Sequence, residues 1–111
     1  MFIMNGNDIE ITKGDCGIFT VSFTGDDAPV DGTHVLVSLK KSVNEDEVIW
    51  EKDLTVSSGI ITVSLENEDT NLDFGGYSWD LRIIYNDGFI YTPIDPASFV
   101  VKKVVGNVEQ S

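Results

Sequence analysis

The sequence predicts an all-β protein, specifically an antiparallel two-sheet β-sandwich of about seven to eight strands. Apolar residues recur at every second position in short segments, and turns rich in Gly, Asp, Asn or Pro separate these segments. No helical period is visible in any window of about 11 residues. We therefore expect a single domain over residues 1–111, with a core at about 8–105, a short N-terminal arm and a polar C-terminal tail.

Four strands are expected in the first half of the chain, at residues 8–12, 17–24, 33–41 and 48–54. Residues 25–32 contain two glycines, a proline and three aspartates, which is typical of a loop. The apolar run Val48-Ile49-Trp50 interrupts the alternation of the fourth strand, so its register stays open. The inward side chains expected at alternate positions are Ile9, Ile11, Phe19, Val21, Phe23, Val35, Val37 and Leu39.

The second half begins with the turn Ser57-Ser58-Gly59 and a strand that buries Ile61, Val63 and Leu65. Residues 66–73 are too polar and too few for a stable helix, and we expect a single 3₁₀ turn. A long strand at 76–85 and the hairpin turn Asn86-Asp87-Gly88 follow. Because proline cannot donate to a sheet, Pro93 and Pro96 predict a break between strands at 89–92 and 98–105.

The spacing Asp73-x-Gly75-x-Tyr77 is the feature that specifies the type of sandwich. In immunoglobulin-like domains a tyrosine at this point, the tyrosine corner, bonds through its hydroxyl to the backbone of the preceding turn. Trp79 stands two residues later, where antibody domains place a cysteine, and we expect it to anchor the core. The spacing therefore predicts an immunoglobulin-like β-sandwich.

The charge excludes several classes of partner. The chain has 7 basic and 19 acidic residues, so its formal net charge is −12. Nucleic acids and anionic membranes would be repelled, because both are bound through lysine and arginine. The acidity favours solubility first, and a basic protein partner or a divalent cation second.

The ends and the cysteine content predict where the protein is made. Cys16 is the only cysteine, so no intrachain disulfide can form, which suggests a reducing compartment. Residues 1–4 are apolar but too few for a signal peptide, and no segment has the length of a membrane span. We expect a soluble protein made in the cytoplasm.

No residue set indicates catalysis, and we expect no enzyme, no cofactor and no bound metal. His34 is the only histidine, and it falls within a strand pattern in which the sequence reveals no positioned partner. Cys16 lies at a turn that leads into a strand, where we expect a small, partly buried residue rather than a reactive thiol.

Calcium is the one metal that the sequence raises as an alternative. Asp69, Asn71 and Asp73 alternate, and Asp80 stands where a twelve-residue loop would place its closing carboxylate. Phe74 occupies the position that requires glycine, and no helix flanks the loop. The same residues serve equally well as the turn before the tyrosine corner.

Aromatic residues raise a second alternative, a carbohydrate-binding face, because sugars stack on exposed rings. We expect Trp79 to be a core residue instead, since aromatics supply much of the core of a small domain. The positions of Trp50 and Tyr91 stay open. The aromatic residues concerned are Trp50, Trp79, Tyr85, Phe89 and Tyr91.

Several segments together resemble those of small bacteriophage and prophage structural proteins with an immunoglobulin-like sandwich, including the N-terminal domain of a baseplate upper protein. The resemblance covers about residues 8–105. Two departures are Cys16, where threonine or serine is usual, and the interruption Pro93-Ile94-Asp95-Pro96. The segments that carry it are Ile11-Thr12-Lys13-Gly14-Asp15 before a strand ending in Phe23, Glu68-Asp69-Thr70-Asn71-Leu72 leading to Gly76-Tyr77-Ser78-Trp79-Asp80-Leu81, Asp87-Gly88 with Thr92, and Phe99-Val100-Val101.

This resemblance implies a non-enzymatic component of a phage particle, of the tail or baseplate type, that acts through protein–protein contacts. Its partners would be other phage structural proteins or further copies of this chain. We expect docking through a sheet face or an edge strand, for which the strand at 99–105 is one candidate because Lys102 and Lys103 are common edge protectors. The alternative is a module that binds carbohydrate or a host surface.

Overall fold

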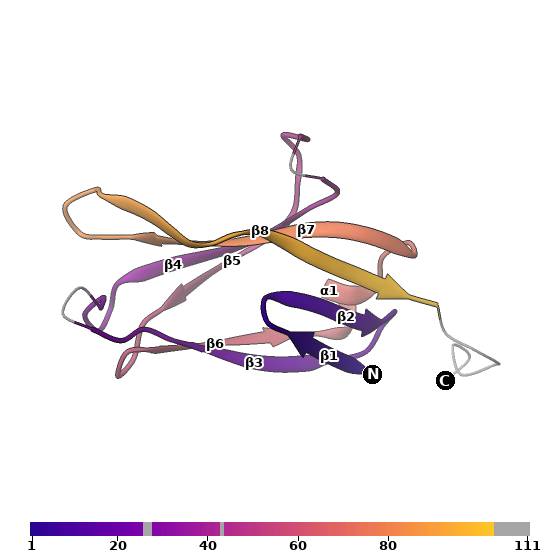
Figure 1. Ribbon diagram of the computed structural model, residues 1–111, viewed down its shortest axis with the longest axis horizontal. Coiled ribbons are helices and arrows are strands. Elements are labelled where there is room, and N and C mark those ends of the chain that lie inside the picture. Colours follow the sequence, from indigo (N-terminus) through magenta and orange to yellow (C-terminus); the bar gives the residue numbers. More distant parts are fainter. Residues whose placement is uncertain (26–27, 43, 104–111) are drawn as a thin grey trace.

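The computed structural model describes residues 1–25, 28–42 and 44–103. In this part of the chain, eight strands form two sheets (Figure 1). The six-stranded sheet has the order β1 (Phe2–Asn5), β2 (Asp8–Thr12), β8 (Ile90–Lys102), β7 (Gly75–Ile84), β4 (His34–Lys40) and β5 (Val48–Thr55). The two-stranded sheet pairs β3 (Gly17–Ser22) with β6 (Ile60–Leu65). An all-β fold with two sheets is therefore confirmed.

The expectation that every strand pairs antiparallel is wrong. β2 runs parallel to β8, with Ile9 opposite Phe99 and Ile11 opposite Val101. The other pairs in both sheets are antiparallel, so the larger sheet is mixed. Alternation of apolar residues specifies which face of a strand is buried, but it carries no information on strand direction.

β8 replaces the two strands expected on either side of the prolines. It runs unbroken through Pro93 and Pro96, and its register against β7 shifts twice. Ala97 pairs with Trp79, Ile94 with Leu81 and Tyr91 with Ile83. At each of these two steps, β8 advances by three residues while β7 advances by two. Each proline lies within one of these irregular steps, where a missing N–H is tolerated. Residues 104–111, including the end of the expected last strand and the polar tail, lie outside the described residues.

β1 is a strand where only an N-terminal arm was expected. It forms a hairpin with β2, and the Phe2 ring stacks on Phe19 of β3 with 6.1 Å between ring centres. Trp79 also connects the layers. Its ring meets Phe19 edge-on at 5.6 Å, and its indole N–H donates to the carbonyl of Asn7 over 2.8 Å. The N-terminal hairpin thus helps to join the two sheets.

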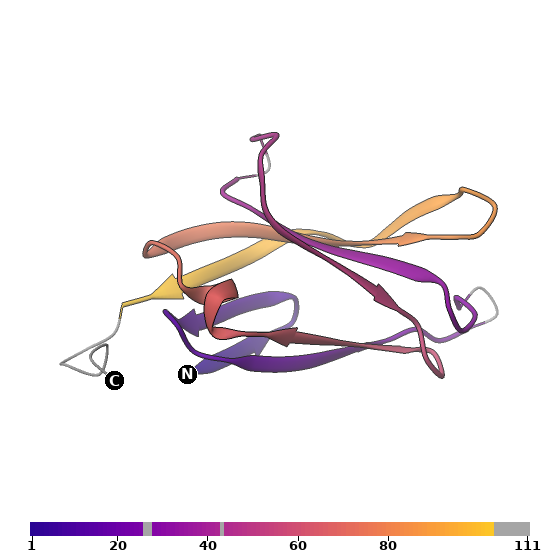
Figure 2. The same cartoon turned by 180° about the vertical axis from the view of Figure 1, so that it is seen from behind.

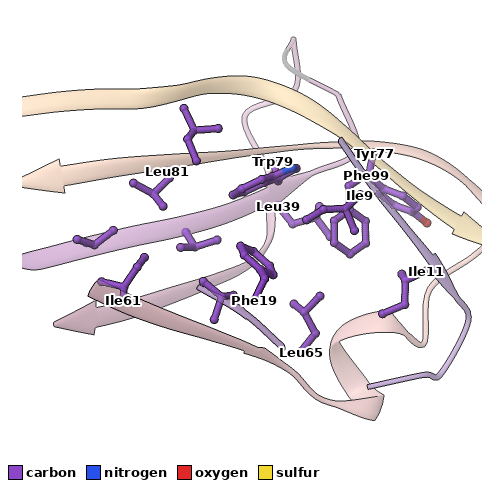
Figure 3. Close-up of a cluster of buried hydrophobic side chains, with 14 of the residues drawn as sticks. Ile9, Ile11, Phe19, Leu39, Ile61, Leu65, Tyr77, Trp79, Leu81 and Phe99 are labelled. Carbon is purple, nitrogen blue, oxygen red and sulfur yellow. The ribbon is translucent and has the colours of Figure 1, made fainter. Parts of the chain in front are cut away.

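The core lies between the two sheets and contains most of the side chains that alternation placed inward (Figure 3). Trp79 is 2% exposed, which confirms its expected role as a core anchor. Val21, Phe23 and Tyr85 are only partly buried at the margin of this core. Other members drawn from both sheets are Ile9, Ile11, Phe19, Val35, Val37, Leu39, Ile61, Val63, Leu65, Tyr77, Leu81, Ile83, Phe99 and Val101.

The tyrosine corner forms as predicted. The Tyr77 hydroxyl donates a hydrogen bond of 2.7 Å to the backbone carbonyl of Asp73. Gly75 has a φ of +133°, a conformation that side chains disfavour, and this places the chain for its entry into β7. Burial, and then the negative charge of Asp73, raises the pKa of the Tyr77 hydroxyl above its ordinary value.

The segment before the corner is one turn of α-helix, α1 (Asn67–Thr70), rather than the expected 3₁₀ turn. Figure 2 shows it between the end of β6 and the start of β7. Asp69 caps this turn, since its carboxylate accepts the Glu66 N–H over 2.8 Å and pairs with Lys52 of β5 at 2.8 Å. The polar segment is therefore attached to the six-stranded sheet.

A bulge explains the irregular alternation in β5. Leu39 pairs with Trp50, but the next residue of β4, Lys40, pairs with Val48, so Ile49 is an extra residue. After the bulge, Trp50, Lys52 and Leu54 are half-buried and the residues between them are exposed. No helix in the described residues is long and apolar enough to cross a membrane.

Candidate functional site

A cleft of about 670 Å³ lies between the β7–β8 hairpin and the end of β3. Figures 1 and 2 show the hairpin and the β3–β4 connection at the same end of the molecule, opposite the end of β8. Ring-bearing residues dominate its walls. The described lining residues are Ser22, Phe23, Thr24, Ala28, Pro29, Ile83, Tyr85, Asp87, Phe89, Tyr91 and Pro93.

The hairpin wall follows from its turn chemistry. Gly88 has a φ of +88°, which the turn Asn86-Asp87-Gly88 requires. The Tyr85 N–H bonds to the Phe89 carbonyl and the Gly88 N–H to the Tyr85 carbonyl, both over 2.9 Å. Asp87 Oδ1 accepts the Phe89 N–H over 2.9 Å. These bonds hold Phe89 and Tyr91 at the tip and along the first residues of β8.

The rings on this wall are open to solvent. Phe89 is 61% exposed and Tyr91 is 52% exposed, and the neighbouring Ile90 is 55% exposed. The Phe89 ring contacts Tyr85, whose ring centre lies 5.9 Å away. Exposed apolar side chains that gather beside a hollow are typical of a binding surface, whereas isolated ones are not.

The opposite wall is supplied by the end of β3 and by the segment that follows it. The Phe23 N–H bonds to the carbonyl of Gly59 over 2.8 Å, which fixes the end of β3 against the β5–β6 turn. Pro29 is buried and Val30 is 66% exposed. A shallower hollow of about 380 Å³ adjoins the cleft and shares Ala28, Pro29 and Tyr85 with it.

The cleft can hold a ligand by ring contacts and by a few polar groups. Phe89 and Tyr91 offer ring faces, and Ser22, Thr24 and Tyr91 carry hydroxyls. Asp87 is the one charged residue among the described lining residues. All seven basic residues of the chain are at described positions, and none of them lines this cleft.

The structure separates the five aromatic candidates into two groups. Tyr85, Phe89 and Tyr91 come together at the cleft. Trp79 is in the core, and Trp50 is half-buried with its indole N–H donating to the Asp69 carbonyl over 3.0 Å. Phe23 and Pro29 are not identifiable as site residues from the sequence, because nothing in it indicates that they face the hairpin.

Neither His34 nor Cys16 is among the described residues that line this cleft. His34 is exposed on β4, and its Nδ1 lies 2.9 Å from Asp53 Oδ1 on β5. Cys16 is a free, exposed thiol, so the expectation that it is partly buried is wrong. It lies just before β3, in phase with Ile18 and Thr20, which are exposed on the outward face of that strand.

The four residues of the possible calcium loop do not converge. The Asp69 carboxylate already accepts the Glu66 N–H and forms an ion pair with Lys52. Asp73 contributes its backbone carbonyl to the corner, and Asp80 lies along β7 opposite Ser38 of β4. Among the described residues, no group of three or more His, Cys, Asp or Glu side chains is arranged to hold a metal ion. Asn71 is exposed after α1.

The strand proposed as a docking edge is not an edge. β8, which contains Phe99 and Lys102, lies between β2 and β7 and pairs with both. The edges of the six-stranded sheet are β1 and β5 instead. The error arises because parallel pairing with the N-terminal β2 covers the outer side of β8. Val104 and Val105 lie outside the described residues.

Comparisons of this chain with protein-family models, with curated proteins and with solved structures found no match.

Proposed function

We propose that this protein is a non-enzymatic structural component of a phage or prophage particle, of the tail or baseplate type, and that it acts through protein–protein contacts. Two of the segments that carry the sequence resemblance touch each other, which supports reading them as one unit. The Thr70 hydroxyl donates to the Asp15 carbonyl over 2.7 Å, and the Gly14 N–H bonds to the Thr70 carbonyl over 3.2 Å. Thr70 is fully buried.

The proposal includes a more specific assignment of the fold, namely that the two sheets form an immunoglobulin-like sandwich. In such domains strands B and E share one sheet, strands C, F and G share the other, and the tyrosine corner precedes strand F. The pairing of β3 with β6, the order β8-β7-β4 and the corner before β7 support this assignment. The cleft then lies between the B–C and F–G loops, where variable domains place binding loops.

The observation that carries a binding role is the exposed aromatic wall of the cleft, formed by Phe89 and Tyr91 on the β7–β8 hairpin. Exposed rings rimmed by polar groups favour protein contacts, because aromatic residues are enriched in interfaces. The net charge of −12 favours a partner with a basic surface.

Purified virions from the strain that carries this gene, collected after prophage induction, test the proposal. We expect quantitative mass spectrometry to find this chain at a fixed ratio to the major tail proteins through successive density gradients. A non-structural phage protein of similar abundance in the same lysate serves as the control. Virions that lack the chain, or contain it only at the level of the control protein, would overturn the proposal.

The alternative function is a module that binds carbohydrate or a host surface. One observation favours it, namely that Tyr91 is exposed beside Phe89 in a cleft that also carries hydroxyl groups. Trp50 does not add to that surface, since it is half-buried and bonded to Asp69. Binding to a glycan array or to intact host cells, lost on Tyr91→Leu and retained on Phe74→Leu, would support this alternative.

A further inference from the structure

Elsewhere on the molecule, lysines lie over aromatic rings. The ammonium nitrogens of Lys13 and Lys103 are 5.4 and 5.6 Å from the centre of the Phe74 ring. Phe74 is itself 51% exposed. Lys41 lies 4.6 Å from the ring centre of Tyr77, and Lys52 lies 5.3 Å from that of Trp50. A cation within about 6 Å of a ring centre is attracted by the negative face of the ring.

The cleft is different, because it has exposed rings and no cation. No basic side chain of the described chain lies over Phe89 or Tyr91, although both are more than half exposed. Lys52, Arg82 and Lys102 are held by carboxylates on other parts of the sheets. The rings of the cleft therefore offer the kind of surface that the chain covers with lysine elsewhere.

Asp87 adds a negative charge at the same place. Its Oδ1 is used by the Phe89 N–H, and its other oxygen takes part in no hydrogen bond or ion pair with the described residues. A carboxylate beside ring faces matches a guanidinium or ammonium group, which stacks on the ring and pairs with the carboxylate. The net charge of −12 attracts such a group from a distance.

From this combination we propose that the cleft binds a basic side chain, arginine or lysine, presented by a protein partner. The inference rests on the proposed function, in that the ligand belongs to a protein, and it adds the chemistry by which that protein is recognised. A volume of about 670 Å³ exceeds what one side chain needs. The partner would therefore insert a basic residue together with part of the loop or chain end that carries it.

The probe for this proposal is a fluorescent nine-residue peptide of alternating glycine and arginine. A matched peptide carries citrulline in place of arginine, which keeps the shape and removes the charge. Binding to the full chain is followed by fluorescence anisotropy at a fixed ionic strength. We expect the arginine peptide to bind at least about tenfold more tightly than the citrulline peptide, a ratio that corresponds to one well-placed ion pair stacked on a ring.

Variants separate the cleft from general charge attraction. Tyr91→Leu and Phe89→Leu remove a ring but keep an apolar side chain, and Phe74→Leu is the matched change at the far end of β7. Asp87→Asn keeps an oxygen for the Phe89 N–H, and Asp46→Asn is its matched loss of one charge on an exposed turn. We expect each cleft variant to weaken the arginine peptide several-fold and both controls to leave its affinity unchanged, with the melting temperatures of all five variants close to that of the parent.

Three results would overturn the proposal. Equal affinity for the two peptides would mean that charge is not recognised. Equal weakening by Asp87→Asn and Asp46→Asn, with no effect of the ring variants, would mean that only the net charge attracts the peptide. The third result combines two observations, namely glycan binding that is lost on Tyr91→Leu and equal affinity for the arginine and citrulline peptides. It would assign the cleft to carbohydrate.

The peptide experiment and the virion experiment can fail independently of each other. If the chain is found in virions but the peptides do not discriminate, the cleft proposal fails while the structural role stands. If the peptides discriminate but the chain is missing from virions, the recognition chemistry stands and the phage role fails.

Discussion

The Tyr77 hydroxyl ties β7 to the turn that precedes it, through a bond of 2.7 Å to a backbone carbonyl. Tyr77→Phe removes this bond with little change in shape and leaves the Asp73 carbonyl without its partner. We expect a loss of about 1 kcal/mol in the free energy of unfolding, measured by urea denaturation. Tyr91→Phe, at an exposed position, is the control and should cost nothing measurable. No loss on Tyr77→Phe would show that the corner does not contribute to stability.

The same hydroxyl predicts a dependence on alkaline pH. Its pKa is raised in the folded protein by burial and by Asp73, so above about pH 10 the unfolded chain releases this proton first. Stability from this group is complete below that pH and falls as the pH rises through the folded pKa. We expect the difference in unfolding free energy between the parent and Tyr77→Phe to shrink above pH 10. A difference that stays constant to pH 12 would contradict the raised pKa.

At the scale of elements, the N-terminal hairpin depends on close packing between β1 and the start of β3. A Cβ atom added at Gly17 would lie 2.9 Å from the Phe2 ring, so that ring would have to move from its stack on Phe19. We expect Gly17→Ala to cost on the order of 1 kcal/mol and to speed amide exchange in β1 while leaving β4 and β7 protected.

Gly76→Ala is the matched control, because Gly76 also lies in a strand and a Cβ there meets nothing within 4 Å. It should leave stability unchanged or slightly increased, since alanine restricts the unfolded chain more than glycine does. Equal destabilisation by the two changes would argue against a specific contact between Gly17 and Phe2.

The elements also show what alternation can and cannot predict. The segment at 8–12 was located correctly because Ile9 and Ile11 alternate with polar residues and both are buried. The break expected at Pro93 and Pro96 did not occur, because two irregular steps in the register accommodate both prolines. Phe2 gave no signal of a strand, since four residues are too few to show a period and the contact with Phe19 is non-local.

At the scale of the whole molecule, the cleft could be predicted only in part. The turn Asn86-Asp87-Gly88 predicted a hairpin, and Tyr85, Phe89 and Tyr91 were already candidates for an exposed face. The other wall could not be predicted from the sequence, since Phe23 and Pro29 reach the hairpin only when the two sheets pack.

The two tryptophans differ in how far their burial could be predicted. The burial of Trp79 followed from the corner spacing, whereas that of Trp50 depended on a bulge at Ile49 and on the position of α1.

The excess of acidic residues sets a final prediction, on the salt dependence of stability. At a formal net charge of −12, the acidic side chains repel one another in the folded state. Most of the ion pairs in the described residues are exposed and contribute little to stability. Raising NaCl from about 20 to about 200 mM shortens the Debye length from roughly 20 to 7 Å. We expect the melting temperature to rise by several degrees, which corresponds to about 1 kcal/mol for a domain of this size.

A triple variant on the turn between β4 and β5 supplies the matched test of this mechanism. Glu45→Gln, Asp46→Asn and Glu47→Gln remove three exposed charges that take part in no ion pair with the described residues, so the net charge becomes −12 + 3 = −9. At low salt this variant should melt higher than the parent, and its melting temperature should respond less to NaCl, because less repulsion remains to be screened. A melting temperature that falls with salt in both proteins would mean that attraction within pairs such as Lys52–Asp69 outweighs the repulsion of the net charge.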